Sequence, residues 1–268
     1  MTNAAPTISL VIATYNWPEA LELCLLSVLC QEKMPDEILI ADDGSGPATK
    51  ELIERFKKIS PVHIQHIWHP DEGFNLAQIR NKATVAAMGK YIIQIDGDLI
   101  LHRCFIKDHW MAAKPGHFIA GSRVILTKQF SEKIFRTKAI TVSIFQKGIN
   151  NRFNGIHSGY WGHVASLFVK TRNTINIRGC NMSFWKNDFL AVNGYNENYT
   201  GWGREDTDLV FRFYNSGLQR TYFKLRGIVF HLWHKEADRS GLIKNDSILE
   251  ETALTKAKRT TKGADQYI

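Results

Sequence analysis

The chain has 268 residues, of which 44% are hydrophobic and 22% charged, a composition typical of soluble globular enzymes. No apolar run in it approaches the ~18 residues needed to cross a bilayer. The first residues lack a positive region, and residues 8–13 are too short for the core of a signal peptide. We therefore expect a cytoplasmic protein made of one large domain or two closely packed ones.

The charge balance predicts an anionic partner. Lys and Arg number 34 against 26 Asp and Glu, which gives a net charge of +8. Anionic lipid headgroups, sugar-nucleotide phosphates and nucleic acid all carry the complementary charge. No nucleic-acid-binding motif is recognisable, so we expect substrate binding or peripheral contact with the inner face of a membrane, and no nucleic acid. The basic tail at residues 256–262 is expected to be a frayed polar end.

The first 95 residues alternate between predicted strands and helices. We predict strands at residues 8–13, 37–41, 62–68 and 90–95, and helices from Pro18 to Leu29, at 49–60 and at 75–88. Such alternation is typical of an α/β fold with a mostly parallel sheet that is covered by helices on both faces.

Beyond Ser122 the pattern weakens. Residues 124–177 mix basic, aromatic and polar side chains without a clear period, which is typical of a lid, a binding loop or a partly disordered segment. Regular structure is predicted again as strands at 179–184 and 222–232 and as helices at 187–192 and 205–215. The four cysteines form no Cys-x-x-Cys pair, so we expect buried thiols and no zinc or disulfide framework.

Polar residues follow three of the predicted parallel strands: Thr14-Tyr15-Asn16, Asp42-Asp43 and Asp96-Gly97-Asp98. The carboxyl ends of parallel strands meet at one edge of a sheet, where α/β proteins bind ligands. Two carboxylates one residue apart suit a divalent cation that also holds phosphate oxygens. An aromatic ring for a nucleobase, a carboxylate for an N–H of that nucleobase and an Asp pair for ribose and metal together predict a nucleotide-diphosphate site. Each fragment alone is weak evidence, because Asp-Gly-Ser is an ordinary turn.

Two further groups in the C-terminal part can carry chemistry. Glu205 and Asp206 begin a predicted helix, where adjacent side chains point about 100° apart and can take different roles. Acids are also stabilised at a helix N-terminus without any catalytic role. His231 and His234 follow the last predicted strand, and imidazole combined with carboxylate and diphosphate oxygens suits Mn²⁺ or Mg²⁺.

Several motifs resemble those of known enzymes. Val11–Asn16, Asp42–Ser45, Arg80-Asn81 and Asp96–Asp98 resemble family 2 glycosyltransferases of the GT-A fold. The stretch from Gly179–Phe184 through Asn193-Gly194-Tyr195 to Gly201–Asp208 resembles the C-terminal half of β-1,4-galactosyltransferases and of bacterial chondroitin-type polymerases. Residues 124–177 are covered by neither resemblance.

The resemblance implies a Rossmann-like sheet flanked by helices and a three-part organisation. Residues 1–122 would be the nucleotide-sugar-binding half, and residues 123–178 a variable loop or acceptor segment. Residues 179–268 would be the acceptor-binding and catalytic-base half, with a basic tail.

The resemblance also implies roles on the donor side. Thr14, Tyr15, Asn16 and Asp43 would lie at the nucleotide, with Tyr15 and Asp43 in contact with uracil. Arg80 would help at the nucleotide, and Asp96 would bind ribose. Asp98 would hold the metal, Mn²⁺ or Mg²⁺.

On the acceptor side, the resemblance makes Asp206 the general base and Glu205 a ligand of the acceptor sugar. Trp202 would form a wall against that sugar. Similar galactosyltransferases place a metal-binding His near His234 and a second ligand near His231, and the sequence leaves open which of the two binds. The vertebrate-type motif has Gly where this chain has Arg204.

Together these features predict an inverting, metal-dependent transfer of a hexose or N-acetylhexosamine (galactose, N-acetylgalactosamine or N-acetylglucosamine). The donor would be a UDP-sugar, and the acceptor a surface glycan, either an oligosaccharide or a lipid-linked chain. One alternative is a sugar-nucleotide pyrophosphorylase, which would carry a Gly-rich loop where Thr14–Trp17 has none. A second is a non-catalytic glycan-binding module, which would explain the basic charge but not Glu205-Asp206.

Overall fold

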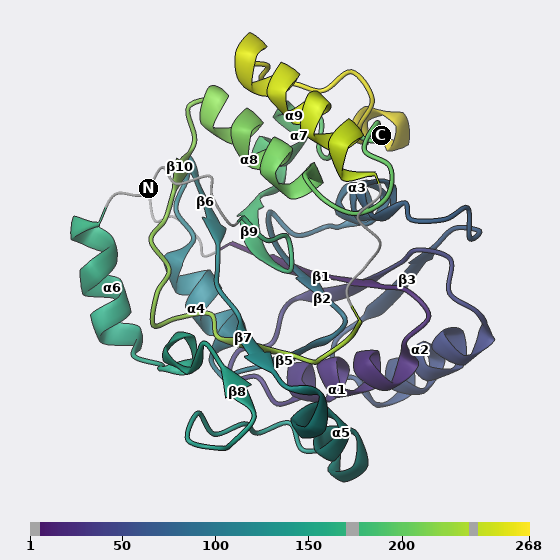
Figure 1. The fold of residues 1–268 in the computed structure, drawn as a ribbon, viewed down its shortest axis with the longest axis vertical. Helices are drawn as coiled ribbons and strands as arrows, with labels where there is room; N and C mark the ends of the chain where they lie inside the picture. The colour runs from purple at the N-terminus through teal and green to yellow at the C-terminus, as the bar shows by residue number, and fades with distance from the viewer. Residues whose placement is uncertain (1–5, 170–176, 236–240) are drawn as a thin grey trace.

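The computed structural model describes residues 6–169, 177–235 and 241–268, and its centre is a seven-stranded sheet (Figure 1). The strands lie in the order β10-β6-β9-β4-β1-β2-β3. Their bounds are β1 (Ile8–Thr14), β2 (Glu37–Asp42), β3 (Ile64–Trp68), β4 (Tyr91–Asp96), β6 (His117–Ala120), β9 (Asn181–Trp185) and β10 (Gln219–Arg220). Strand β9 runs antiparallel to both neighbours, and the other paired strands are parallel. The predicted mostly parallel α/β sheet is confirmed.

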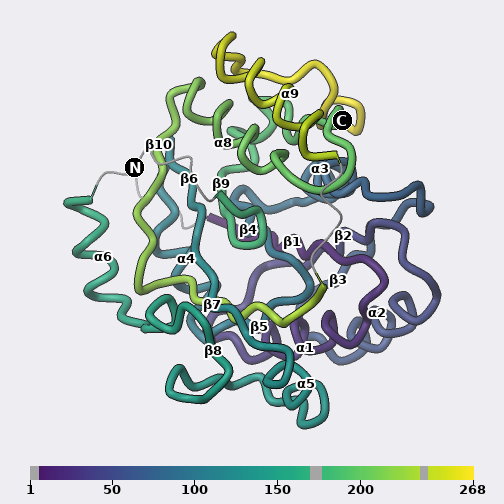
Figure 2. Tube along the Cα trace, viewed as in Figure 1, coloured from purple at the N-terminus to yellow at the C-terminus, as the bar shows by residue number. Residues whose placement is uncertain are grey.

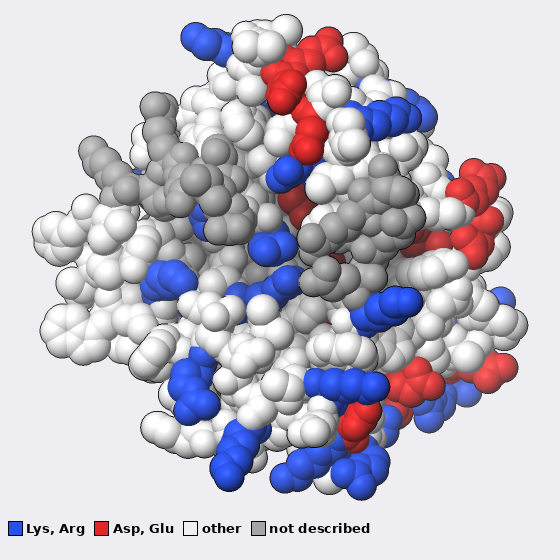
Figure 3. All heavy atoms as spheres, in the orientation of Figure 1, with Lys and Arg blue, Asp and Glu red and all other residues white. Residues whose placement is uncertain are grey.

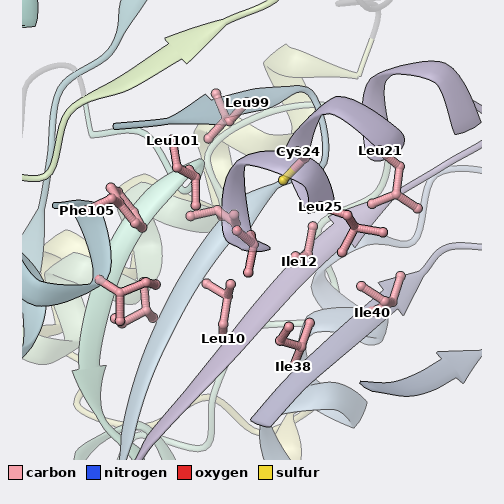
Figure 4. Packing of buried hydrophobic residues seen from close by; sticks show 14 of the residues in the cluster. Leu10, Ile12, Leu21, Cys24, Leu25, Ile38, Ile40, Leu99, Leu101 and Phe105 are labelled. Atoms are coloured by element: carbon pink, nitrogen blue, oxygen red, sulfur yellow. The ribbon is translucent and has the colours of Figure 1, made fainter. Parts of the chain in front are cut away.

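Helices cover both faces of this sheet, because alternate residues of each central strand point to opposite sides. Leu10 and Ile12 of β1 pack with Leu21 on one face (Figure 4), while Val11 packs with Ile79 on the other. The first face is covered by α1 (Pro18–Leu29), α2 (Pro47–Ile59) and α4 (Phe105–Ala112), and the second by α3 (Leu76–Ala86), α7 (Lys186–Ala191) and α8 (Glu205–Asn215). None of the helices in the described residues is long and apolar enough to cross a membrane.

A smaller sheet of four strands, in the order β5-β11-β7-β8, lies beside the first. Its strands are β5 (Leu99–Leu101), β7 (Val124–Leu126), β8 (Ile149–Asn150) and β11 (Val229–His231). Strand β11 pairs antiparallel with β5, so that His231 lies opposite Leu99. This pairing brings the C-terminal histidines next to Asp98, although they are far apart in the sequence.

The segment 123–178 contains more regular structure than the sequence predicted. It includes α5 (Lys128–Thr137), a short 3₁₀ helix η1 (Arg152–Gly155) and α6 (Gly159–Phe168), which lies at the edge of the molecule (Figure 1). Helix α5 packs Phe130 and Ile134 into a cluster with Val124 and Leu126 of β7. These few apolar residues of α5 lie among basic ones, so the sequence pattern did not reveal the helix. The expectation of an irregular loop was wrong here.

The strand predicted at 222–232 was also mostly wrong, because only Val229–His231 is extended and paired. Leu225 and Gly227 have positive φ angles of 63° and 56°. Left-handed residues interrupt an extended strand, and an apolar pattern does not reveal them.

The basic tail is packed rather than frayed, so that expectation was wrong as well. After α9 (Leu242–Thr255), Thr260 is buried, its carbonyl accepts a hydrogen bond from Asn193 at 3.0 Å, and Glu197 N–H donates to Lys262 O at 3.1 Å. The chain then ends in η2 (Ala264–Tyr267), which packs on α3 (Figure 2). Two of the four cysteines, Cys24 and Cys180, are buried as predicted, whereas Cys30 is exposed.

A buried ion pair ties α8 to its surroundings. Arg212 Nη2 lies 2.7 Å from Asp208 Oδ2, and the two side chains are 1% and 0% exposed. Arg212 also donates to the carbonyls of Val192 and Gly194 at 2.8 and 2.6 Å, while Thr252 of α9 donates to Asp208 at 2.7 Å. Arg212 thus bonds α8 to the turn at Val192–Gly194, and Asp208 bonds it to α9.

We expect Arg212→Ala to lower the free energy of unfolding by about 3–5 kcal/mol, because it leaves the Asp208 carboxylate buried and unpaired. Urea denaturation measures the loss. Arg55→Ala is the control, since Arg55 pairs with Glu22 at the surface with 65% of its side chain exposed, and such pairs contribute about 1 kcal/mol or less. Equal losses in the two variants would contradict the stated role of the buried pair.

Candidate active site

Arg80 of α3 is a buried cation surrounded by carboxylates. Its side chain is 1% exposed, Nη2 donates to Asp96 Oδ1 at 2.7 Å, and Nη1 donates to Asp206 Oδ1 at 2.9 Å. Glu205 Oε1 lies 3.8 Å from the same Nη1. Burial alone would lower the pKa of Arg80, but Tyr195 and the three acids raise it above its ordinary value. A permanent cation thus joins the carboxyl end of β4 to the start of α8.

The Asp206 carboxylate is fixed by donors on both oxygens. Its Oδ2 accepts from Gly179 N–H at 2.7 Å, and its Oδ1 accepts from Tyr195 Oη at 3.4 Å as well as from Arg80. The Tyr195 hydroxyl is in turn held by the Gln94 amide, at 2.8 and 3.1 Å. Burial raises the pKa of Asp206 and outweighs the opposite effect of Arg80. With 19% of its side chain exposed, Asp206 is an oriented and reachable carboxylate of enhanced basicity.

Glu205 lies beside Asp206 but in a different environment. Its side chain is 8% exposed, and its Oε2 has no hydrogen-bond partner among the described residues. Burial, and then the charge of Asp206, raise the pKa of Glu205 to about 8. Helix α8 begins directly after Arg204, whose φ of 81° sets the turn that presents both acids. The half-buried Trp202 lies on the same turn.

Asp98, His231 and His234 form a second group next to Asp96. The Nε2 atoms of both histidines lie 3.4 Å from Asp98 Oδ2. Asp98 Oδ1 is buried without a hydrogen-bond partner in the described part of the chain. The Leu232 N–H donates to Asp98 O at 3.0 Å, which fixes the two segments together.

This donor set fits a divalent cation. Burial raises the pKa of Asp98 to about 8, with a further contribution from Asp96, so the site favours the incoming positive charge. Burial lowers the pKa of His231 to about 3, so its imidazole stays neutral and can act as a ligand. One carboxylate and two imidazoles suit Mn²⁺ or a similar ion. His102, Cys104 and His157 also lie close together at the other end of β5, but His157 already pairs with Asp108 at 3.0 Å.

The strand ends converge as the sequence predicted, since Ala13 pairs with Asp96 and Thr14 with Asp42. The residues expected at the nucleotide lie along this edge. Tyr15 is 50% exposed, and its hydroxyl donates to Asp71 at 2.8 Å. Asn16 has a left-handed backbone, with φ of 45°, and its Oδ1 accepts from Gly46 N–H at 2.9 Å.

Asp43 lies at the same edge but is buried and already bonded within the protein. Its Oδ1 is 2.7 Å from His69 Nε2, and its Oδ2 accepts from Asn75 N–H at 2.9 Å. Burial raises the pKa of this carboxyl despite those bonds. Its predicted contact with a base stays a prediction.

Two residues that help to position Asp206 were given no role by sequence reasoning. Gln94, which holds the Tyr195 hydroxyl, is a polar residue within the apolar run that precedes Asp96, and that interruption was the signal available for it. Gly179 touches Asp206 so closely that a Cβ atom there would lie 2.0 Å from Asp206 Oδ1. Only glycine fits at this position.

Two known protein families match this chain in sequence. The sequence model described as glycosyl transferase family 2 matches residues 9–173, and one described as the N-terminal domain of galactosyltransferase matches residues 162–235. Chondroitin synthase of Escherichia coli is 24% identical over 78% of this chain and 32% of its own length. Validoxylamine A glucosyltransferase of Streptomyces hygroscopicus subsp. limoneus is 23% identical over 82% of the chain and 50% of its own length. The chain thus spans half the length of these curated relatives or less.

Solved structures show the same fold at low sequence identity. A mannosyltransferase of Pyrobaculum calidifontis, in complex with GDP-Man and Mn²⁺, superposes with a TM-score of 0.63 at 15% identity, over 97% of this chain and 66% of the other. S. aureus TarS gives a TM-score of 0.59 at 13% identity, over 97% of this chain and 41% of the other. The central sheet with helices on both faces is therefore the GT-A architecture.

We expect Gly179→Ala to lower the free energy of unfolding by about 1–3 kcal/mol, because the added methyl group must displace the Asp206 carboxylate from Arg80. Urea denaturation measures the change. Gly159→Ala is the matched control, since a Cβ atom at Gly159 would meet nothing within 4 Å. A loss no larger in Gly179→Ala than in Gly159→Ala would contradict the close contact.

Proposed function

The chain belongs to glycosyl transferase family 2, and on that premise we propose that it is an inverting, metal-dependent enzyme that uses a UDP-sugar. The transferred group would be a hexose or an N-acetylhexosamine, and the acceptor a surface glycan. The observation that carries the proposal is the buried Arg80, which places Asp96 at the end of β4 within one cluster with Asp206 of α8. A donor-side carboxylate and a fixed candidate base are then close enough to act on one substrate pair.

The exposed carboxyl edge of the parallel strands supports the proposed binding of a nucleotide sugar there. Tyr15 offers a half-exposed ring for uracil, and Asp96 is 31% exposed on its side chain, within reach of ribose hydroxyls. The Pyrobaculum calidifontis mannosyltransferase was solved with a nucleotide sugar and Mn²⁺, which supports both a nucleotide-sugar donor and a divalent cation here.

Asp98, His231 and His234 would hold the cation, because their donor atoms already converge and Asp98 Oδ1 has no described partner. When bound, Mn²⁺ or Mg²⁺ supplies positive charge that neutralises the leaving diphosphate.

The protein's own residues account for the proton transfer. Asp206 takes the proton of the acceptor hydroxyl while that oxygen bonds to the anomeric carbon and the carbon–diphosphate bond breaks, which releases UDP. The donors from Arg80, Tyr195 and Gly179 hold the carboxylate in one orientation, and Oδ2, which accepts from Gly179 N–H, has a second lone pair for the incoming hydroxyl. Glu205, which precedes Asp206 at the start of α8, would contact another hydroxyl of the acceptor.

The acceptor proposal rests on the relatives and on the fixed candidate base. Similar proteins include chondroitin synthase and a putative teichuronic acid biosynthesis glycosyltransferase of Bacillus subtilis, which is 32% identical over 37% of this chain and 38% of its own length. Their names support polysaccharide synthesis. The oriented Asp206 favours a transferase over a non-catalytic glycan-binding module.

Peripheral contact with an anionic membrane surface is also part of the proposal. It is supported by the net charge of +8 and by α6, whose side chains Tyr160, Trp161, Leu167 and Phe168 are exposed.

The overall test is UDP release from UDP-galactose, UDP-N-acetylgalactosamine and UDP-N-acetylglucosamine with Mn²⁺ and a glycan acceptor. We expect one donor to give release that depends on both metal and acceptor. No release with any of the three would contradict the proposed donor class.

Metal affinity should rise with pH and level off above about 8. Below this pH, Asp98 holds a proton that the cation must displace, because burial raises the pKa of Asp98 to about 8. One displaced proton corresponds to a loss of up to about tenfold in affinity per pH unit below that point. Calorimetric titration with Mn²⁺ from about pH 6 to 9 measures the slope, and an affinity independent of pH would contradict it.

We expect Asp98→Ala to abolish Mn²⁺ binding, and His231→Ala and His234→Ala to weaken it, because each removes a ligand. The exposed His63 serves as the control in His63→Ala. Unchanged affinity in both single His variants and in the double variant would indicate a site made of oxygen ligands alone.

Asp206→Asn should lower the transfer rate by about 10²–10⁴-fold while affinity for donor and metal stays near that of the parent, since Asn keeps the shape but cannot take the proton. Steady-state kinetics and donor titration separate the two effects. Asp265→Asn, at an exposed carboxylate paired with Arg259, is the control. Turnover near that of the parent in Asp206→Asn would remove Asp206 as the base.

The product should have the anomeric configuration opposite to that of the donor, β from an α-linked UDP-sugar. One base and one displacement form no covalent sugar–enzyme intermediate that could invert twice. The anomeric proton coupling in the NMR spectrum of the product distinguishes the two outcomes. An α-linked product would exclude a single displacement.

A further inference from the structure

A cavity of about 540 Å³ lies next to the candidate active site and is lined by basic side chains. Arg123, Arg178, Arg220 and Lys224 line it, and none of the described residues around it is acidic. Figure 3 shows Lys and Arg side chains gathered around a hollow in the middle of this face. The cavity is thus a concave, strongly positive surface.

One wall of the cavity adjoins the turn that holds Asp206. Arg178 directly precedes Gly179, whose N–H donates to Asp206 at 2.7 Å. Arg123 lies 3.8 Å from Cys180 Sγ, beside the same turn. A ligand group in the cavity and a hydroxyl at Asp206 can therefore belong to one molecule.

The cavity lies on the side of β4 away from the expected nucleotide. Its lining begins at Ala120, where β6 ends, and includes Arg220 of β10, whereas Tyr15 and Asp43 follow β1 and β2. Strands β9, β6 and β10 lie on one side of β4, and β1, β2 and β3 lie on the other. This arrangement separates the cavity from the donor base and places it where an acceptor would approach Asp206.

Two cations of the cavity, Arg220 and Lys224, lie close to each other. Burial, and then the charge of Arg220, lower the pKa of Lys224. The described partner of Lys224 is the neutral Asn154 Oδ1, at 2.8 Å, and Arg220 donates to the carbonyl of Ala120 at 2.6 Å. Cations crowded in this way gain stability when an anion enters.

The sequence around the cavity carries the same charge. Residues 109–187 hold twelve Lys and Arg against a single acid, Glu132. The positive net charge of the chain therefore comes from this segment, which supplies Arg123 and Arg178 of the cavity lining.

We propose that this cavity binds an anionic group of the acceptor, a carboxylate or phosphate of an acidic glycan, while the acceptor hydroxyl reaches Asp206. The inference rests on the proposed function and adds the chemical class of its acceptor. Arg178 and Lys224, both exposed at the rim, would make charge-assisted hydrogen bonds to the anion. Arg123 and Arg220, half-buried deeper in the cavity, would add to its positive field.

The test compares three probes by calorimetric titration in the presence of Mn²⁺ and UDP. They are a hexuronate-containing tetrasaccharide, the same tetrasaccharide with its carboxyl groups reduced to alcohols, and a tetrasaccharide that carries a phosphate in place of the carboxylates. The parent protein should bind one of the two anionic probes at least about tenfold more tightly than the reduced one. Which anionic probe binds more tightly distinguishes carboxylate from phosphate.

The Arg178→Gln, Lys224→Gln double variant should lose this preference, because both rim charges are gone. Lys147→Gln, which removes an exposed charge of the same basic segment outside the cavity lining, should retain it. Equal binding of all three probes by the parent, or a preference that persists in the double variant, would overturn the inference.

Mn²⁺ and UDP binding without acceptor, measured in the same proteins, separates the two proposals. If the parent and the double variant both bind Mn²⁺ and UDP while no anionic preference is found, the acceptor inference fails and the proposed function stands. If the parent binds no UDP in the presence of Mn²⁺, the proposed function itself fails.

Discussion

Arg80 is the charge on which the arrangement of the site depends. Asp96 ends strand β4, and Asp206 lies in the first turn of helix α8, yet both carboxylates accept hydrogen bonds from one buried guanidinium. A buried cation needs such partners, and buried carboxylates need such a cation. The contact between β4 and α8 through Arg80 therefore also brings the carboxylates of Asp96 and Asp206 together.

The neighbouring group has a different composition. Burial, and then the charge of Asp96, raise the pKa of Asp98, and His231 is kept neutral by burial. Around Arg80 three carboxylates share one guanidinium of the protein, whereas the donor atoms beside Asp98 belong to two imidazoles. Within a few residues of β4, the chain thus combines a cluster bridged by its own cation with a donor set that fits an external one.

Sequence reasoning identified the elements whose signals are local. The strands and helices of the first 95 residues show clear periodicity, and their buried strands confirm it. It missed α5, whose core contact is a short stripe around Phe130 and Ile134, and it extended the last strand through Leu225, whose left-handed backbone the apolar pattern does not reveal. The resemblance to known glycosyltransferases identified Arg80 and Asp206 as separate candidates. Their contact depends on tertiary packing, which the spacing of residues along the sequence does not show. Gly179 was missed for the same reason.

The antiparallel strand β9 has a consequence for how the chain folds during synthesis. It inserts between β4 and β6, although it follows them in the sequence by many residues. Until residues 181–185 leave the ribosome, the facing edges of β4 and β6 have no partner, and β4 is apolar along most of its length. Unpaired apolar edges attract other chains. The N-terminal part of a nascent chain therefore exposes unpaired strand edges, and β4 and β6 are joined within the central sheet only when β9 has been synthesised.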